Sequence, residues 1–308
     1  MPEPSRTMRR AELWLGTLVE ISAIAPSQRT LDAGVAAAFA AIARVHHALS
    51  GHDPASELSR VNRHAATVRQ PISDDLRTVL ACALDLAARS NGSFDPTVGG
   101  HVTTLGFLPH HADVNRDVSW RDVELTPRGA FFRRPLVLDF GGIAKGYAVD
   151  CAVDALRAHG ITSGRVNAGG DLRVFGSGSE PIHVRTGGPQ GIVVPLAEIG
   201  DGAVATSAYG GSRRRTAERR WATPLIDPRT GLPVMSRRTV SVIAGTCMLA
   251  DALTKVVALR GRAAAKLLHD YGASATVLSP VAGRWRCMQL PRPVPVGEAT
   301  MVTLSASH

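Results

Sequence analysis

Apolar residues recur at intervals of three and four in two stretches of the N-terminal third, which is the spacing of an amphipathic helix. The first stretch begins at Leu31 and the second at Leu76. The second pattern ends before the tripeptide SNG, where we expect Gly92 to form the C-cap. The apolar positions of the two predicted helices are Leu31, Val35, Ala38, Phe39, Ile42, Val45 and Leu49, and then Leu76, Val79, Leu80, Ala83 and Ala87.

A strand–helix–strand pattern follows in the middle of the chain. The run PLVLDF (135–140) predicts a buried strand, the next two glycines a turn, and residues 144–159 a helix that Gly160 ends. The segment GRVNAGGDLRVFG (164–176) predicts strands interrupted by a glycine pair. Further strands are expected at 13–25, 239–245 and 274–279, with a helix at 247–261 between the last two. Without repeats or a linker, these elements predict one α+β domain, with an arrangement in two lobes as the alternative.

The predicted domain covers residues 13–290. Residues 1–12 are interpreted as an N-terminal tail and residues 291–308 as a Pro-rich C-terminal extension. Glu12 and Glu20 interrupt the apolar part of the N-terminal stretch, and no cleavage site of small residues follows, so we expect a cytoplasmic protein. No apolar run approaches the length of a membrane span.

The net charge of +9 raises the question of a nucleic-acid partner. Only three of the basic residues are lysines, and the arginines are spread along the whole chain. The one dense run, SRRRTAERR at 212–220, lacks interleaved aromatic residues, so it favours a solvated loop, with a contact to an anionic ligand or a partner protein as the alternative. We therefore expect no nucleic-acid partner.

Cysteine and histidine spacing does not favour a transition-metal site. The four cysteines lie far apart and show no zinc or CxxC pattern. His110 and His111 are adjacent, so they would point apart on regular structure, and we interpret them as loop residues.

The stretch LDFGGIAKGYAVD (138–150) places a carboxylate, two glycines and a lysine in one turn. Glycines allow a ligand to approach the backbone closely, and the N-terminus of the following helix would favour an anion such as phosphate. The pattern matches neither of the two standard nucleotide-binding fingerprints. The alternative is a tight turn in which Asp139 caps the helix and Lys145 is solvated.

Three further motifs place polar groups on turns or element ends. GSFDPTVGG (92–100) and LIDPRTGLP (225–233) both contain a stiff Asp-Pro turn. VATSAYGG (204–211) puts Thr206 and Ser207 at a strand end, where their hydroxyls would meet a ligand or the backbone.

In the predicted helix 247–261, Asp251 and Lys255 lie one turn apart, either as an exposed ion pair or facing a metal or phosphate site.

Taken in order, these motifs resemble the ApbE family of FAD:protein FMN transferases. The matching segments begin with the Asn after SELSRV and continue with GSFDPTV, LDFGGIAKGYAVD, VNAGGDL, VATS, IDPRTG and ADAL. The resemblance runs from about Leu15 to about Gly261 and implies a T-fold-like α+β domain with a flavin site. It further implies that Mg²⁺ bridges the protein and the FAD pyrophosphate. FMN would pass to a Thr or Ser of an acceptor flavoprotein, with release of AMP.

The resemblance assigns roles to particular residues. Ser93, Phe94, Asp95, Asp139, Lys145 and Thr206 would bind the flavin nucleotide, with Lys145 and Asp251 as the catalytic pair. The Gly142 carbonyl and the Asp251 carboxylate would hold Mg²⁺, since that ion prefers oxygen ligands.

Two positions depart from the family pattern. Lys255 stands where a hydroxyl residue usually ligates the metal, and a charged ammonium cannot act as a ligand. Either Lys255 replaces part of the metal's charge, or it swings away and the site binds metal weakly. Pro224 stands where a histidine often precedes IDPRTG. If that histidine is the base for the acceptor hydroxyl, transfer would be slow here or would use another group, such as Asp227 or a different carboxylate. Two alternatives therefore stay open, namely hydrolysis of FAD to FMN and AMP, and flavin binding without catalysis.

Overall fold

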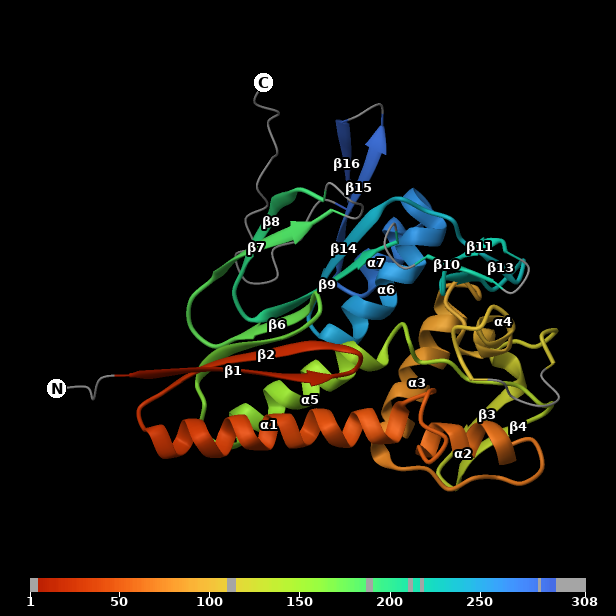
Figure 1. The fold of residues 1–308 in the computed structure, drawn as a ribbon, viewed down its shortest axis with the longest axis horizontal. Coiled ribbons are helices and arrows are strands. Elements are labelled where there is room, and N and C mark those ends of the chain that lie inside the picture. The colour runs from red at the N-terminus through yellow and green to blue at the C-terminus, as the bar shows by residue number, and fades with distance from the viewer. Residues whose placement is uncertain are drawn as a thin grey trace.

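Eight antiparallel strands form the central sheet, in the order β1-β2-β5-β6-β9-β14-β15-β16 (Figure 1). The computed structural model describes residues 5–109, 115–186, 191–209, 213–216, 219–281 and 284–291. The strands of the sheet are β1 (Arg6–Trp14), β2 (Thr17–Ala25), β5 (Ser163–Ala168), β6 (Asp171–Phe175), β9 (Gly202–Ala208), β14 (Thr239–Ala244), β15 (Ser274–Val281) and β16 (Arg284–Leu290).

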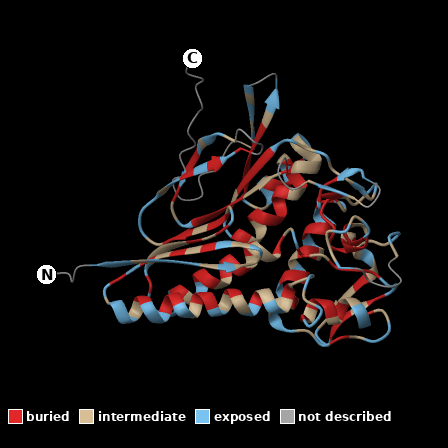
Figure 2. Ribbon diagram, viewed as in Figure 1, coloured by how far each residue is buried: buried red, intermediate tan, exposed pale blue. Residues whose placement is uncertain are grey.

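Two long helices cover one face of this sheet at the β2–β5 end. They are α1 (Gln28–Leu49) and α5 (Ala144–Ala158), which pack against each other (Figure 1). The buried side chains of α1 include all the apolar positions that the helical spacing predicted, and its exposed residues face away from the sheet (Figure 2). The N-terminus of α1 is capped by Ser27, whose hydroxyl accepts a hydrogen bond from the Thr30 amide at 3.0 Å.

The third long helix, α6 (Cys247–Arg260), continues from β14 and packs against α5, β9 and β14. It is buried on most of its surface, including Asp251 and Thr254 at 0% exposure. Since the side of α6 that carries Asp251 is inside the molecule, the interpretation of Asp251 and Lys255 as an exposed ion pair is wrong.

Beyond one end of α1 lies a mainly helical region (Figure 1). It contains α2 (Glu57–His64), α3 (Asp74–Arg89), η1 (Pro96–Val98), α4 (Gly99–Thr104), η2 (Trp120–Asp122) and the hairpin of β3 (Val123–Thr126) and β4 (Gly129–Phe132). After α3 the chain turns with Gly92 at φ +71°, and the Gly92 amide donates to the Ala87 carbonyl at 2.8 Å. The expected glycine turn after this helix is therefore present.

Smaller elements complete the domain. The pair β7 (Glu180–Arg185) and β8 (Val193–Ile199) packs its apolar side chains against those of β6 and β9. The others are β10 (Arg214–Arg215), β11 (Trp221–Ala222), β12 (Ile226–Asp227), β13 (Leu232–Pro233), η3 (Gly261–Ala264) and α7 (Ala265–Asp270). The prediction of a single α+β domain is confirmed.

Two local predictions need correction. The N-terminal strand begins at Arg6, so most of the segment interpreted as a tail (1–12) pairs with β2. The apolar residues 136–138 and Phe140 of the run PLVLDF are buried, with Leu138 at 0% exposure, but the run is not a strand. Its main chain bonds instead to Asn62 and to the Pro96 carbonyl, since an apolar run signals burial without specifying a strand partner.

Other expectations fall partly or wholly outside the described residues. His110, His111 and residues 292–308 of the predicted extension lie outside them. The arginine-rich run 212–220 is described only in part, and its described residues include the strand β10. Among the described helices, none combines the length and apolar character needed to cross a bilayer.

Candidate functional site

Asn62 fixes the segment that carries Asp139. Its amide nitrogen donates to the Leu138 carbonyl at 3.0 Å, and its amide oxygen accepts from the Leu138 amide at 2.9 Å. Asp139 then donates its own amide to the Pro96 carbonyl at 2.8 Å, which ties the segment to the turn that carries Asp95. The Asn of the SELSRVN motif therefore has a structural role that its sequence position alone did not reveal.

Asp139 does not cap α5 as the alternative reading of this turn supposed. Its Oδ1 atom accepts a hydrogen bond from the Gly141 amide at 2.8 Å, whereas the N-cap residue of α5 is Ile143. The Asp139 side chain is partly exposed and lines a cavity. Burial raises the pKa of its carboxyl group, although the Gly141 hydrogen bond opposes that shift.

The glycines of this motif allow other parts of the protein to approach the backbone closely, whereas the expected approach of a ligand stays a prediction. A Cβ atom on Gly142 would lie 2.9 Å from Cε of Lys255, and one on Gly146 would lie 2.2 Å from the Cys247 carbonyl oxygen. The first glycine leaves room for a lysine stem from α6, and the second brings the backbones of α5 and α6 together.

Asp95 is held by the turn it begins. Its Oδ1 atom accepts from the amide and the hydroxyl of Thr97, at 2.9 and 2.7 Å, and its Oδ2 atom accepts from the Trp120 amide at 3.1 Å. Burial raises its pKa, while these hydrogen bonds act in the opposite direction. Ser93 and Phe94, the preceding residues, are almost completely buried and line the same cavity as Asp139.

Hydroxyl groups at the end of β9 also line the cavity. Thr206 is hydrogen-bonded through its hydroxyl to Ser241 at 2.9 Å, and Ser207 to Thr254 at 2.9 Å. Thr206 and Ser207 line the cavity, so contact with a ligand stays a prediction, and the observed hydroxyl partners are side chains and not the backbone.

Four charged side chains alternate in sign beside the cavity. The Lys145 ammonium is hydrogen-bonded to Asp171 and lies 3.7 Å from Oδ2 of Asp251, and the Lys255 ammonium is hydrogen-bonded to Oδ1 of Asp251. The carboxylates are the buried members, with side-chain exposures of 2% for Asp171 and 1% for Asp251, against 34% for Lys145 and 17% for Lys255. The cations therefore lie in front and the anions behind them.

Burial and the neighbouring charges shift the pKa values of three of these side chains. Burial alone would raise the pKa of Asp251, but Lys145 and Lys255 hold it below the usual range. Burial likewise opposes the charge on Lys145, yet the two carboxylates raise its pKa. For Asp171, burial and the nearby negative charge of Asp251 raise the pKa to about 6.

The predicted segments converge on one cavity of about 470 Å³. Its lining includes the apolar residues Val98, Leu225, Ile226 and Leu259 as well as the lysines and hydroxyl groups. Asp251 does not line the cavity but lies directly behind Lys255. The predicted site residues in its lining are Ser93, Phe94, Asp95, Asp139, Gly142, Lys145, Thr206 and Lys255.

Sequence reasoning missed two residues of this site. Asp171, from the VNAGGDL motif, is the partner of Lys145, and its position directly after a glycine pair was the available signal. Tyr209 lines the cavity and donates its hydroxyl to the Thr254 carbonyl at 3.3 Å. It lies in the quoted motif VATSAYGG, but nothing in that pattern distinguished it from a core aromatic residue.

The structure also shows where Pro224 and Asp227 lie relative to the cavity. Pro224 lines the cavity. Asp227, considered as a replacement base, does not, and its carboxylate pairs with the Arg229 side chain at 3.0 Å. The arrangement therefore leaves Asp227 poorly placed to act on a ligand in the cavity.

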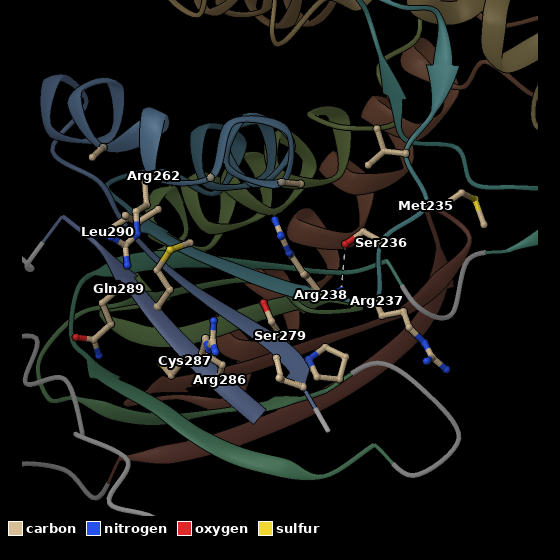
Figure 3. A pocket seen from close by; sticks show the side chains of 17 residues that line it. Met235, Ser236, Arg237, Arg238, Arg262, Ser279, Arg286, Cys287, Gln289 and Leu290 are labelled. Carbon is tan, nitrogen blue, oxygen red and sulfur yellow. Dashed lines mark hydrogen bonds between the residues drawn. The ribbon is translucent and has the colours of Figure 1, made fainter. Parts of the chain in front are cut away.

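A second cavity is larger, about 1280 Å³, but its chemistry differs (Figure 3). It lies between the end of α6, strands β15 and β16, and residues 234–238. Its lining contains no carboxylate and none of the predicted site residues. Its cationic side chains are Arg237, Arg238, Arg262 and Arg286. Cavity volume alone would therefore select this second cavity and not the one where the motifs meet.

Comparisons with known proteins agree with the motifs. The model of the ApbE family matches residues 15–277. A curated relative from Vibrio cholerae, named FAD:protein FMN transferase, is 32% identical over 240 residues, which is 70% of this chain and 70% of the relative. A relative of the same name from Rhodobacter capsulatus is 31% identical over 268 residues, which is 80% of this chain but only 50% of the relative.

Solved structures show the same fold. The flavin transferase ApbE from Vibrio cholerae superposes with a TM-score of 0.79 at 23% identity, covering 94% of this chain and 98% of that one. The ApbE protein from Thermotoga maritima gives a TM-score of 0.76 at 24% identity, covering 88% and 94%.

Proposed function

Because the chain belongs to the ApbE family, we propose that it is an FAD:protein FMN transferase. It would cleave the pyrophosphate of FAD, join FMN through a phosphoester bond to a Thr or Ser of an acceptor flavoprotein, and release AMP. The observation that carries the proposal is the convergence of five separate motifs on the 470 Å³ cavity. Membership of the family supports the reaction, and this convergence supports the cavity as its site.

The lining contains groups that suit both parts of the substrate. Leu225, Ile226 and Leu259 offer apolar contact to a flavin ring, and Lys145 and Lys255 offer positive charge to the diphosphate. Attack of a hydroxyl on phosphorus develops negative charge on the phosphoryl oxygens, which nearby cations stabilise. We assign the diphosphate to the two lysines, with Thr206 as a further contact and Phe94 and Asp95 at the nucleotide.

The acceptor hydroxyl must lose a proton as it attacks. Only Asp95 and Asp139 provide carboxylates to the described lining, and both oxygens of Asp95 already accept hydrogen bonds. Asp139 uses Oδ1 for the Gly141 amide, and no donor to its Oδ2 is found among the described residues. We therefore assign the role of proton acceptor to Asp139, in place of the histidine that Pro224 replaces.

The resemblance also implies Mg²⁺, but the side chains as they lie do not fit it. The carboxylate that would hold the ion, that of Asp251, interacts with Lys255 through Oδ1 and with Lys145 and the Gly146 amide through Oδ2. The described residues contain no group of three or more His, Cys, Asp or Glu side chains suited to a metal. We accordingly derive no step through a metal ion.

The test is to incubate the purified protein with FAD and candidate acceptor flavoproteins, and to follow two products. Transfer predicts AMP by chromatography together with the mass increment of an FMN phosphoester on one acceptor Thr or Ser. AMP and free FMN without labelled acceptor would select FAD hydrolysis, the second candidate, which the loss of the usual histidine at Pro224 favours. FAD binding without any AMP would select a non-catalytic flavin-binding protein.

A further inference from the structure

Lys255 lies between the buried Asp251 and two residues that line the cavity, Ser207 and Gly142. Its ammonium donates to Oδ1 of Asp251, to the Asp251 carbonyl at 3.2 Å and to the Ser207 hydroxyl at 3.4 Å. Its stem passes over Gly142, since a Cβ on that glycine would lie 2.9 Å from Cε of Lys255. An ammonium group has three donors, and all three find acceptors here.

Neighbouring residues hold Lys255 in this position, which differs from that of a solvated surface lysine. The Lys255 side chain is 17% exposed, and that exposed part lines the cavity. The other Lys–Asp pair at the same helical spacing, Lys266 and Asp270, lies on the surface with 86% of the lysine side chain exposed. The burial of Asp251 makes removal of its partner costly, which holds the ammonium in place.

We propose that the Lys255 ammonium is a built-in cation that takes the place of a divalent metal at the diphosphate subsite of the cavity. Lys145 and Lys255 face the cavity, while Asp171 and Asp251 lie behind them and orient them. A diphosphate in the cavity meets two positive charges that these carboxylates hold in position. A divalent ion approaching Asp251 meets the ammonium first.

This inference rests on the proposed function for the identity of the ligand. The prediction about metal binding is independent of the proposed function. The wild-type protein should bind FAD with the same Kd in EDTA as in Mg²⁺, as followed by flavin fluorescence. Lys255→Thr removes the charge and places a hydroxyl near Asp251, so it should bind Mn²⁺ about tenfold or more tightly than wild type does, because groups that contact a metal ligand change affinity on that scale. Free Mn²⁺, counted by its electron paramagnetic resonance signal, measures this directly.

The control is Lys266→Thr, which removes the exposed lysine of the same spacing and should leave Mn²⁺ uptake and FAD affinity at the wild-type values. Lys255→Met is a second variant that keeps the stem over Gly142 and removes only the charge, and it replaces Lys255→Thr if that variant fails to fold. With either variant, gain of Mn²⁺ binding supports the proposal.

Two results would overturn it. One is wild-type protein that takes up Mn²⁺ as tightly as the Lys255 variants do. The other is wild-type FAD affinity that falls tenfold or more in EDTA. If FAD binds under neither condition, the proposed function fails, and the Mn²⁺ comparison still decides whether Lys255 excludes a metal.

Discussion

At the scale of single residues, the site is a set of carboxylates with different partners. The Asp95 carboxylate accepts hydrogen bonds within its own turn, and the Asp227 carboxylate pairs with Arg229. Asp171 and Asp251 pair with lysines. Asp139 alone combines a place in the described lining with an oxygen that lacks a donor there. The surroundings of each carboxylate therefore give different roles to Asp residues that look equivalent in the sequence.

Asp139→Asn should lower the rate of AMP release by about 100-fold or more, which is the usual contribution of a positioned general base. FAD affinity should change little, because the amide keeps the size of the side chain. Steady-state kinetics with separate FAD titration distinguishes the two effects. If the variant binds FAD more weakly but turns over at the wild-type rate when FAD is saturating, the assignment is contradicted.

The pH profile of transfer gives an independent test of the same residue. The carboxylate form of Asp139 accepts the proton, so the rate should fall as pH falls through its pKa. Burial raises that pKa, and the acid limb should therefore lie above the ordinary Asp value of about 3.9. In Asp139→Asn the remaining slow reaction should lack this limb, whereas an unchanged limb would assign it to another group.

At the scale of elements, the junction of α5 and α6 positions both lysines. Asp150, near the middle of α5, accepts from the Cys247 and Met248 amides at 2.9 and 2.8 Å, and from Arg173 at 2.7 Å. It thus satisfies the amides at the start of α6 from a neighbouring helix. The approach of the two helices also depends on Gly146.

Replacing Asp150 by Ala should lower the free energy of unfolding by about 3 kcal/mol, because buried amides and Arg173 lose a charged partner. Asp154→Ala, one turn later on the exposed side of α5, is the matched control and should stay within about 0.5 kcal/mol of wild type. Denaturation by urea measures both. Equal losses in the two variants would refute the role given to Asp150.

Gly146→Ala should cost about 1–3 kcal/mol, since the added methyl meets backbone that is not free to move aside. Gly245→Ala serves as its control, because a Cβ there has no atom within 4 Å. The same urea experiment applies. If Gly146→Ala is as stable as Gly245→Ala, the helices do not need this close contact.

Elements were also the scale at which the sequence was most informative. The four long helices follow from apolar spacing or from glycine boundaries, and they are present within a few residues of the expected ends. The run 135–140 was wrongly assigned to a strand, because four apolar residues fit any buried segment equally well. The partner of that segment is Asn62, 76 positions away from Leu138, and local patterns hold no information on such a contact.

At the scale of the whole molecule, the site exists only because distant segments meet. The order of the motifs predicted a shared site through family resemblance, whereas periodicity and spacing placed no two of them together. The buried state of Asp251 and the pairing of Lys145 with Asp171 depend on how α5, α6 and β6 pack. These features were beyond sequence reasoning because they arise from tertiary contacts.

The most direct test of the account is a crystal structure of the wild-type protein with FAD bound. The diphosphate should lie in the 470 Å³ cavity with its oxygens on the Lys145 and Lys255 ammonium groups, and with the flavin ring against Leu225 and Ile226. FAD bound in the larger arginine-lined cavity, or away from both lysines, would contradict it.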